Sequence, residues 1–312
     1  MKTKLINIIV ITLSIVSLIE LLFNRTLVFS TISYSLNLWT TSIIPSLFPF
    51  FIISDILIKY NAVNYIPNFI KKYFSKLFNV SDNVFIVFIL SMLSGFPSSA
   101  RCIRTMYDNN MLDEKEASHA LIFTHFSNPL FIMGVVAVFF LKNEKLGLII
   151  LISHYISNII LGITTRKMTV PSKINQSNLK NNSSINFPKI FISAINNAIN
   201  TLLMILGTLS CFLVISSLII NKINLDVYTA SIFKGILEIT MGLESLCSIG
   251  IPDIYKVVIS TMFISFGGLS VHIQILSFLI DTKISYRQFF IARIFHAIIS
   301  GIISYLLYII FI

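Results

Sequence analysis

Residues 84–107 read VFIVFILSMLSGFPSSARCIRTMY, an apolar stretch interrupted in its middle by SGFPSS. A transmembrane helix needs about 20 consecutive apolar residues, and each half of this stretch is too short to span. Residues 254–280 have the same form, with SFGG at 265–268. Interrupted apolar segments in corresponding places of two halves are typical of transporters, whose binding sites lie at the interruptions. The sequence therefore predicts two broken, re-entrant helical hairpins.

The rest of the chain has the composition of a helical membrane protein. Of its 312 residues, 55% are hydrophobic and 12% charged, whereas a soluble domain carries roughly 25% charged residues. The run at 5–23 is too long for a cleaved signal segment and lacks a small-residue cleavage site, so we expect it to be retained as the first helix. Uninterrupted candidate spans cover residues 5–23, 34–58, 117–141, 146–165, 190–220 and 286–311.

The basic residues indicate how the chain is oriented. The net charge of +10 sits in short loops between apolar spans, as the positive-inside rule requires, so we expect no nucleic-acid partner. Residues 166–189 are rich in Asn and Ser, hold five Lys or Arg and no acid, and read as a cytoplasmic linker. It separates an N-terminal half, 1–165, from a C-terminal half, 190–312. Their opposite predicted orientations favour inverted repeats.

Residues 62–80 form another basic segment, in which lysines alternate with aromatic residues. This amphipathic pattern predicts a helix lying in the headgroup plane of the membrane.

The first interruption has features of an anion site. Pro97 suits a first helical turn, so a half-helix should begin here, with free N–H groups and a positive dipole end that attract anions. Arg101 adds a permanent charge at membrane depth, which indicates function by default. The alternative is that Arg101 anchors the helix at the cytoplasmic surface.

Three further places carry candidate polar groups. Gly267 and Gly268 permit close backbone approach, although helix packing through small residues is the alternative. Pro129 removes one helical hydrogen bond and frees carbonyl groups, or simply kinks its helix. Glu238 lies among apolar residues, where it should pair, line a water-filled cavity or bind a coupling cation. The candidate substrate-binding residues are Ser94, Gly95, Pro97, Ser98, Ser99, Arg101, Asn128, Pro129, Glu238, Thr240, Gly267, Gly268 and Ser270.

Motifs for other chemistry are missing from the sequence. The three cysteines and five histidines show no metal-ligand spacing, and no nucleophile or nucleotide-binding motif occurs. We therefore expect no enzyme activity, no cofactor and no bound metal. The expected partners are the lipid bilayer, a small anionic solute and a coupling cation. The sequence does not decide whether the chain forms a homo-oligomer.

Several segments resemble a known family. LWTTSIIPSLFPFFIIS at 38–54, SGFPSS at 94–99, FTHFSNPLFIMG at 123–134 and HYISN at 154–158 resemble the sporulation integral membrane protein YlbJ family. GILEITMG at 235–242 and SFGGLSVH at 265–272 resemble the nucleoside-recognition gate domain, which that family contains. The resemblance covers roughly 34–305. This chain is shorter than typical members and has GFPSS where a Tyr and a further Gly are expected.

The resemblance implies a multi-pass protein of endospore-forming bacteria, in a membrane around the forespore. The family is associated with moving dipicolinate, a small aromatic dianion, into the developing spore. The function expected from the sequence is therefore transport of a small organic anion, with dipicolinate as the first candidate. The alternatives are a nucleoside-type transporter and a non-transporting membrane scaffold of sporulation. A scaffold gains nothing from unpaired backbone at membrane depth.

Overall fold

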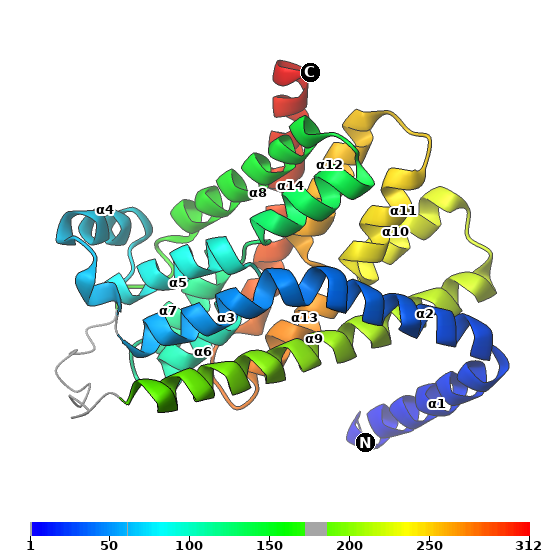
Figure 1. Ribbon diagram of the computed structural model, residues 1–312, viewed down its shortest axis with the longest axis horizontal. Coiled ribbons are helices and arrows are strands. Elements are labelled where there is room, and N and C mark those ends of the chain that lie inside the picture. The colour runs from blue at the N-terminus through cyan, green and yellow to red at the C-terminus, as the bar shows by residue number, and fades with distance from the viewer. Residues whose placement is uncertain (1, 61, 172–185) are drawn as a thin grey trace.

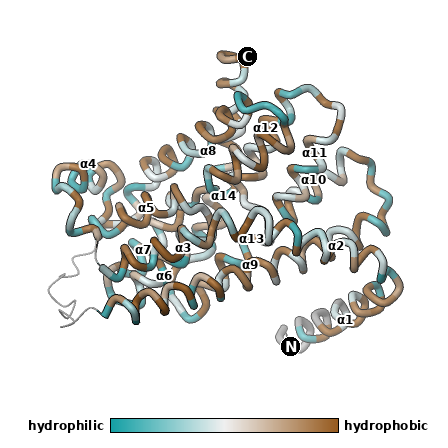
Figure 2. The backbone as a smooth tube through the Cα atoms, in the orientation of Figure 1, coloured by the Kyte–Doolittle hydropathy of each residue, from teal (hydrophilic) through white to brown (hydrophobic). Residues whose placement is uncertain are grey.

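The computed structural model describes residues 2–60, 62–171 and 186–312, which form helices and their connections, without a strand among them (Figure 1). Five helical stretches are long and apolar enough to cross a membrane: Arg25–Lys59, Glu144–Thr165, Phe187–Ile223, Asp253–Leu279 and Tyr286–Phe311. Hydrophobic residues run along most of the backbone (Figure 2). The predicted class, an all-α polytopic membrane protein, is confirmed.

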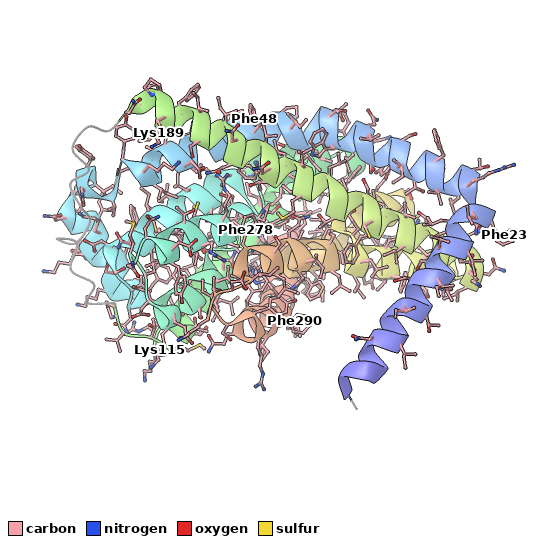
Figure 3. The ribbon with its side chains drawn as sticks, turned by 90° about the horizontal axis from the view of Figure 1, so that it is seen from below. Phe23, Phe48, Lys115, Lys189, Phe278 and Phe290 are labelled. Carbon is pink, nitrogen blue, oxygen red and sulfur yellow. The ribbon has the colours of Figure 1, made fainter. Side chains whose placement is uncertain are left out.

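The N-terminal half opens with α1 (Lys2–Phe23). This helix projects away from the body of the molecule and joins it at Phe23 (Figure 3). The next helix runs as α2 (Arg25–Leu38), a π-helical turn η1 (Trp39–Ile43) and α3 (Ile44–Lys59). Pro45 lacks the N–H that would continue regular hydrogen bonding, which accounts for the wider turn before it. There follow η2 (Ala62–Tyr65), α4 (Asn68–Phe78), α5 (Asp82–Ser94), α6 (Ser98–Asp108), α7 (Glu114–Phe123), η3 (Phe131–Phe140) and α8 (Glu144–Thr165).

Apart from α1, η2 and α4, the elements of the C-terminal half follow the same order. This half contains α9 (Phe187–Ile223), α10 (Val227–Leu237), α11 (Ile239–Ser248), α12 (Asp253–Phe266), α13 (Gly268–Leu279) and α14 (Tyr286–Phe311). Each half thus has a long helix, a pair of short helices, a second broken pair and a final long helix. By this order α5–α6 corresponds to α10–α11, α7–η3 to α12–α13, and α8 to α14. Opposite orientation of the halves in a membrane stays a prediction.

The first short pair, α5 and α6, is a helical hairpin. The chain reverses at residues 95–97, where Gly95 has φ +76°. Asn83 Nδ2 donates to the carbonyl oxygen of Met111 at 2.9 Å and so closes the base of the hairpin. The hairpin predicted at 84–107 is present as a helical reversal, and its entry from one face of the membrane stays a prediction.

The second hairpin lies elsewhere than predicted. Residues 254–280 form one candidate span, Asp253–Leu279, interrupted at Gly267. Gly267, with φ +95°, ends α12, and α13 starts at the next residue without reversing. The prediction of a hairpin at 254–280 was therefore wrong, because a glycine pair permits a local break as readily as a reversal. The hairpin of this half is α10–α11, which reverses at Glu238.

The span predicted at 117–141 is also divided. α7 ends at Phe123, η3 begins at Phe131, and residues 124–130 between them are not helical. Pro129 cannot donate a helical hydrogen bond, which explains why the break falls here. The prediction of an uninterrupted span was wrong, although it had placed the weak point at Asn128-Pro129.

Two pairs of long helices enclose the broken elements. α2–α3 runs beside α9 (Figure 1), where Phe51 and Leu202 lie in one apolar cluster and Trp39 Nε1 donates to the carbonyl of Leu202 at 2.9 Å. α8 packs against α14 and α12 on the other side. Of the predicted linker, residues 172–185 lie outside the described residues.

Candidate functional site

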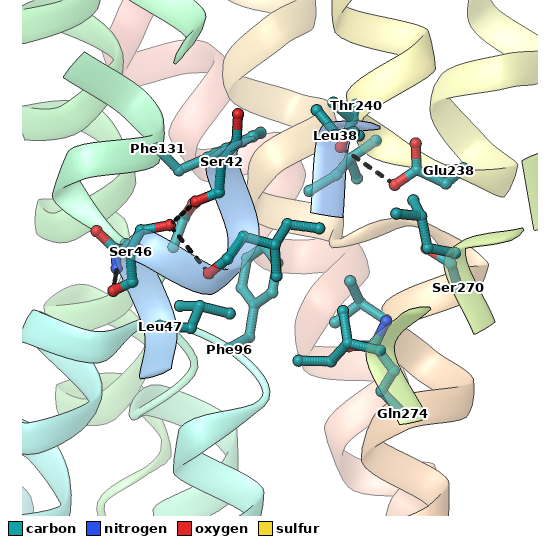
Figure 4. Close-up of a pocket in the computed structure, with 17 residues that line it drawn as sticks. Leu38, Ser42, Ser46, Leu47, Phe96, Phe131, Glu238, Thr240, Ser270 and Gln274 are labelled. Carbon is teal, nitrogen blue, oxygen red and sulfur yellow. Dashed lines mark hydrogen bonds between the residues drawn. The ribbon is translucent and has the colours of Figure 1, made fainter. Parts of the chain in front are cut away.

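A cavity of about 680 Å³, counting its open mouth, lies where all four interruptions meet (Figure 4). Phe96 comes from the tip of hairpin α5–α6, and Asn128 from the break between α7 and η3. Glu238 comes from the tip of hairpin α10–α11, and Ser270 from the start of α13. The other described lining residues are Leu38, Ser42, Ile43, Ser46, Leu47, Ser127, Phe131, Ile205, Leu209, Ile239, Thr240, Val271 and Gln274.

Asn128 joins the first hairpin to the first broken span. Its Nδ2 donates to the carbonyl oxygens of Ser94 at 3.3 Å and Ser46 at 3.4 Å, and its Oδ1 accepts from Leu130 N–H at 2.7 Å. A Cβ at Gly95 would overlap the backbone of Asn128, so this close approach requires glycine. The structure thus brings together three predicted residues, Ser94, Gly95 and Asn128.

Glu238 caps the second helix of hairpin α10–α11. It is 3% exposed and caps α11 by accepting from Met241 N–H at 2.9 Å and from Thr240 Oγ1 at 3.3 Å. Its own carboxylate therefore occupies the helix N-terminus that would attract an anion. A Cβ at Gly268 would lie 3.0 Å from the side chain of Ile239, so the second hairpin also touches the second broken span. Glu238 is the one charged residue among the described lining residues.

Arg101 lies outside the cavity lining. It is 6% exposed, pairs with Asp55 of α3 at 2.9 Å and donates to the Phe51 carbonyl at 2.8 Å. Asn197 of α9 also donates to Asp55, at 3.0 Å. A buried guanidinium without a partner would be very costly, and Asp55 supplies the compensating charge. The predicted residues that do not line the cavity are Ser94, Gly95, Pro97, Ser98, Ser99, Arg101, Pro129, Gly267 and Gly268, whereas Asn128, Glu238, Thr240 and Ser270 do.

Arg293 is a buried residue that the sequence analysis did not single out. It lies in α14 with no exposed surface and donates to the carbonyl of Ile122, to that of His125 at 3.3 Å and to Asn158 Oδ1 at 3.3 Å. The Ile122 carbonyl belongs to the last turn of α7, and that of His125, which also accepts from Asn158 Nδ2 at 2.7 Å, lies in the break just after it. A cation is favourable at a helix C-terminus. An arginine inside an apolar span was the available signal.

Hydrogen bonds fix the protonation of the neighbouring histidines. Ser127 N–H donates to His154 Nε2 at 2.9 Å, so that nitrogen must carry a lone pair. The Arg293 guanidinium lies 2.8 Å from His296 Nδ1, which must therefore accept. Each ring can then keep only its other nitrogen protonated, with Ser265 Oγ as the partner of His154 and the His154 carbonyl as the partner of His296. Both imidazoles are neutral in this arrangement.

Comparison with known proteins agrees with the motifs. The Gate family, described as nucleoside recognition, matches residues 40–143. This range holds the first hairpin and the first broken span, whereas the GILEITMG and SFGGLSVH motifs lie beyond it. The sporulation integral membrane protein YlbJ of Bacillus subtilis (strain 168) is 28% identical over 311 residues, 88% of this chain and 76% of the relative.

This chain is similar to YlbJ. The resemblance inferred from the sequence is confirmed by that similarity and by the Gate match. Solved structures give no match. Similarity to YlbJ, an integral membrane protein by name, agrees with the five apolar helices, and the chain is a multi-pass membrane protein.

Proposed function

We propose that this protein carries a small organic solute across a membrane, and that its cavity binds the solute. The observation that supports transport is the convergence of four interrupted elements on one cavity. Non-helical backbone at membrane depth is tolerated where it is buried in protein or lines a water-filled space, and transporter sites are typically built there.

The first candidate solute is dipicolinate, carried during endospore formation in a membrane around the forespore. Its support is the similarity to a sporulation membrane protein. The lining offers the Ser270 hydroxyl and the second N–H of the Gln274 amide, whose first N–H donates to Thr208 at 3.0 Å. Phe96 and Phe131 offer ring faces for a planar aromatic solute.

The dianion and the Glu238 carboxylate repel each other unless a cation accompanies the solute. We therefore propose that Glu238 takes up the coupling cation, which lies between its carboxylate and that of the solute. This gives the carboxylate a role beyond its capping of α11. Arg101 serves as an internal ion pair with Asp55 in this mechanism rather than as a ligand.

The second candidate is a nucleoside. It is favoured by two observations, the uncharged polar groups that dominate the polar part of the lining and the nucleoside-recognition description of the Gate match. A nucleoside needs no counter-charge at Glu238.

The test is uptake of labelled dipicolinate and, separately, labelled uridine into vesicles that contain the purified protein. The variants are Ser270→Ala, in the lining, and Ser277→Ala, two turns along the same helix and outside the lining. Dipicolinate uptake that Ser270→Ala weakens and Ser277→Ala leaves unchanged supports the proposal. Uridine uptake alone selects the nucleoside reading. Failure to move either solute, with hairpin substitutions tolerated in sporulating cells, supports a scaffold.

A further inference from the structure

The helix α4 exposes a combination of side chains that packing within the chain does not explain. It lies at 89° to α5, so it runs crosswise to the hairpin. One face is buried, with Phe74 and Phe78 in ring contact at 4.6 Å. The opposite face leaves Phe69 64% and Tyr73 77% exposed. A soluble surface rarely carries such large exposed aromatics, whereas the membrane interface favours them.

Two lysines border this aromatic face. At 100° per residue, Lys72 and Lys76 lie next to Phe69 and Tyr73 on the helix surface, and both lysines are exposed. Neither forms an ion pair with a residue in the described part of the chain. Lys71 differs, because it is buried and lies 3.8 Å from Asp82. The charges of Lys72 and Lys76 are therefore available to an external anion.

The end of α8 extends this basic surface. Asn79, just after α4, donates to the carbonyls of Arg166 at 3.1 Å and Thr169 at 2.7 Å. Arg166 and Lys167 are exposed there. Aromatic residues beside a group of basic residues match the headgroup region of an anionic bilayer, which attracts cations while the rings enter the acyl boundary.

We propose that α4 and the end of α8 bind anionic phospholipid headgroups and thereby hold the base of hairpin α5–α6. The basic surface consists of Lys72, Lys76, Arg166 and Lys167. Only residues 79–81 separate α4 from α5, and the tip of this hairpin places Phe96 in the cavity. An anionic lipid bound at α4 thus restrains one wall of the cavity from its far end. This inference does not depend on which solute is carried.

The experiment titrates phosphatidylglycerol or phosphatidylcholine into the full-length protein in detergent and follows the unfolding temperature. A ligand that binds the folded state raises this temperature. The test variant is Lys72→Gln/Lys76→Gln. The matched control is Lys142→Gln/Lys145→Gln, which removes the same charge from exposed positions at the opposite end of α8.

We expect phosphatidylglycerol to raise the unfolding temperature more than phosphatidylcholine does. The half-saturating concentration should be about thirtyfold higher in Lys72→Gln/Lys76→Gln, since each lysine near an anionic surface contributes about fivefold, and unchanged in the control. The difference should shrink at high salt. Phosphatidylglycerol should also slow hydrogen exchange in residues 82–94 of the wild type. Equal responses to the two lipids, or equal responses of the two variants, would overturn the proposal, as expected if α4 instead bound an acidic protein.

Discussion

His154 of α8 and His296 of α14 lie ring to ring, with centroids 4.8 Å apart, and His296 Nε2 lies 3.0 Å from the carbonyl oxygen of His154. The two residues are 142 positions apart, the same interval that separates Glu144 from Tyr286, the first residues of their helices. Each histidine is therefore the eleventh residue of its helix. The meeting point lies beside the breaks rather than in the cavity lining.

The buried pair of Arg101 and Asp55 should behave as a structural unit. Arg101→Ala or Asp55→Ala alone leaves one buried charge and should lower the free energy of unfolding by about 3–5 kcal/mol. The double variant Asp55→Leu/Arg101→Met removes both charges and should recover most of this loss. Thermal unfolding in detergent compares the stability of the two single variants, the double variant and the wild type. If the double variant is stable yet takes up no solute, Arg101 does contact the solute after all.

Glu238 should be needed for transport more than for folding. In Glu238→Gln the side-chain carbonyl can still accept from Met241 N–H, so the unfolding temperature should stay close to that of the wild type. Cation-driven uptake should fall about tenfold or more, because the charge is lost. The control is Glu244→Gln, in the same helix, where Glu244 accepts from Tyr34 at 2.5 Å outside the lining. Unchanged uptake and cation dependence in Glu238→Gln would remove the carboxylate from the mechanism.

Arg293 should stabilise the broken span. Arg293→Met leaves the carbonyl of Ile122 without this donor, whereas that of His125 keeps Asn158 Nδ2 at 2.7 Å. A buried unsatisfied group costs about 1–3 kcal/mol, so we expect a loss of this size, with Arg293→Lys intermediate, measured by thermal unfolding. Arg287→Met, at an exposed position in the first turn of the same helix, should have little effect. Equal stability of Arg293→Met and Arg287→Met would contradict the capping role.

Close contact of α10 with α11 should depend on glycine. A Cβ at Gly242 would overlap the backbone of Gly235, so Gly242→Ala should destabilise by about 1–3 kcal/mol. Gly207→Ala, in the middle of α9 with no atom within 4 Å of the new Cβ, should be neutral or stabilise by about 0.5–1 kcal/mol. Unfolding temperatures compare the two variants. A Gly242→Ala protein as stable as Gly207→Ala would mean that the helices can separate freely.

The sequence predicted where the helices are interrupted better than it predicted whether the chain reverses at each interruption. SGFPSS, Asn128-Pro129 and the pair Gly267-Gly268 all proved to be breaks, because Pro and Gly act on the local backbone. Gly95 has ψ −178° and Gly267 has ψ −6°, and glycine can adopt both. The residue type therefore could not distinguish a reversal from a continuing span.

Long-range pairing accounts for the other differences. Arg101 was interpreted as an unpaired charge, because its partner, Asp55, lies 46 residues earlier in another helix. No spacing rule connects the two residues. Glu238 was singled out as an isolated acid, and it lines the cavity. The hairpin around it was missed, since apolar residues flank it on both sides without a Pro or a turn motif. Arg293 carried the same signal as Arg101, an ionisable group within an apolar span.

The cap that Arg293 places on α7 also constrains biogenesis. The carbonyl of Ile122 is synthesised 171 residues before the arginine that donates to it. The carbonyl of His125 has a second donor within its own half, because Asn158 Nδ2 of α8 donates to it at 2.7 Å. Until α14 is inserted, the Ile122 carbonyl lacks the donor that it has in the folded chain, so the N-terminal half reaches its final hydrogen bonding only after the C-terminal half has been made.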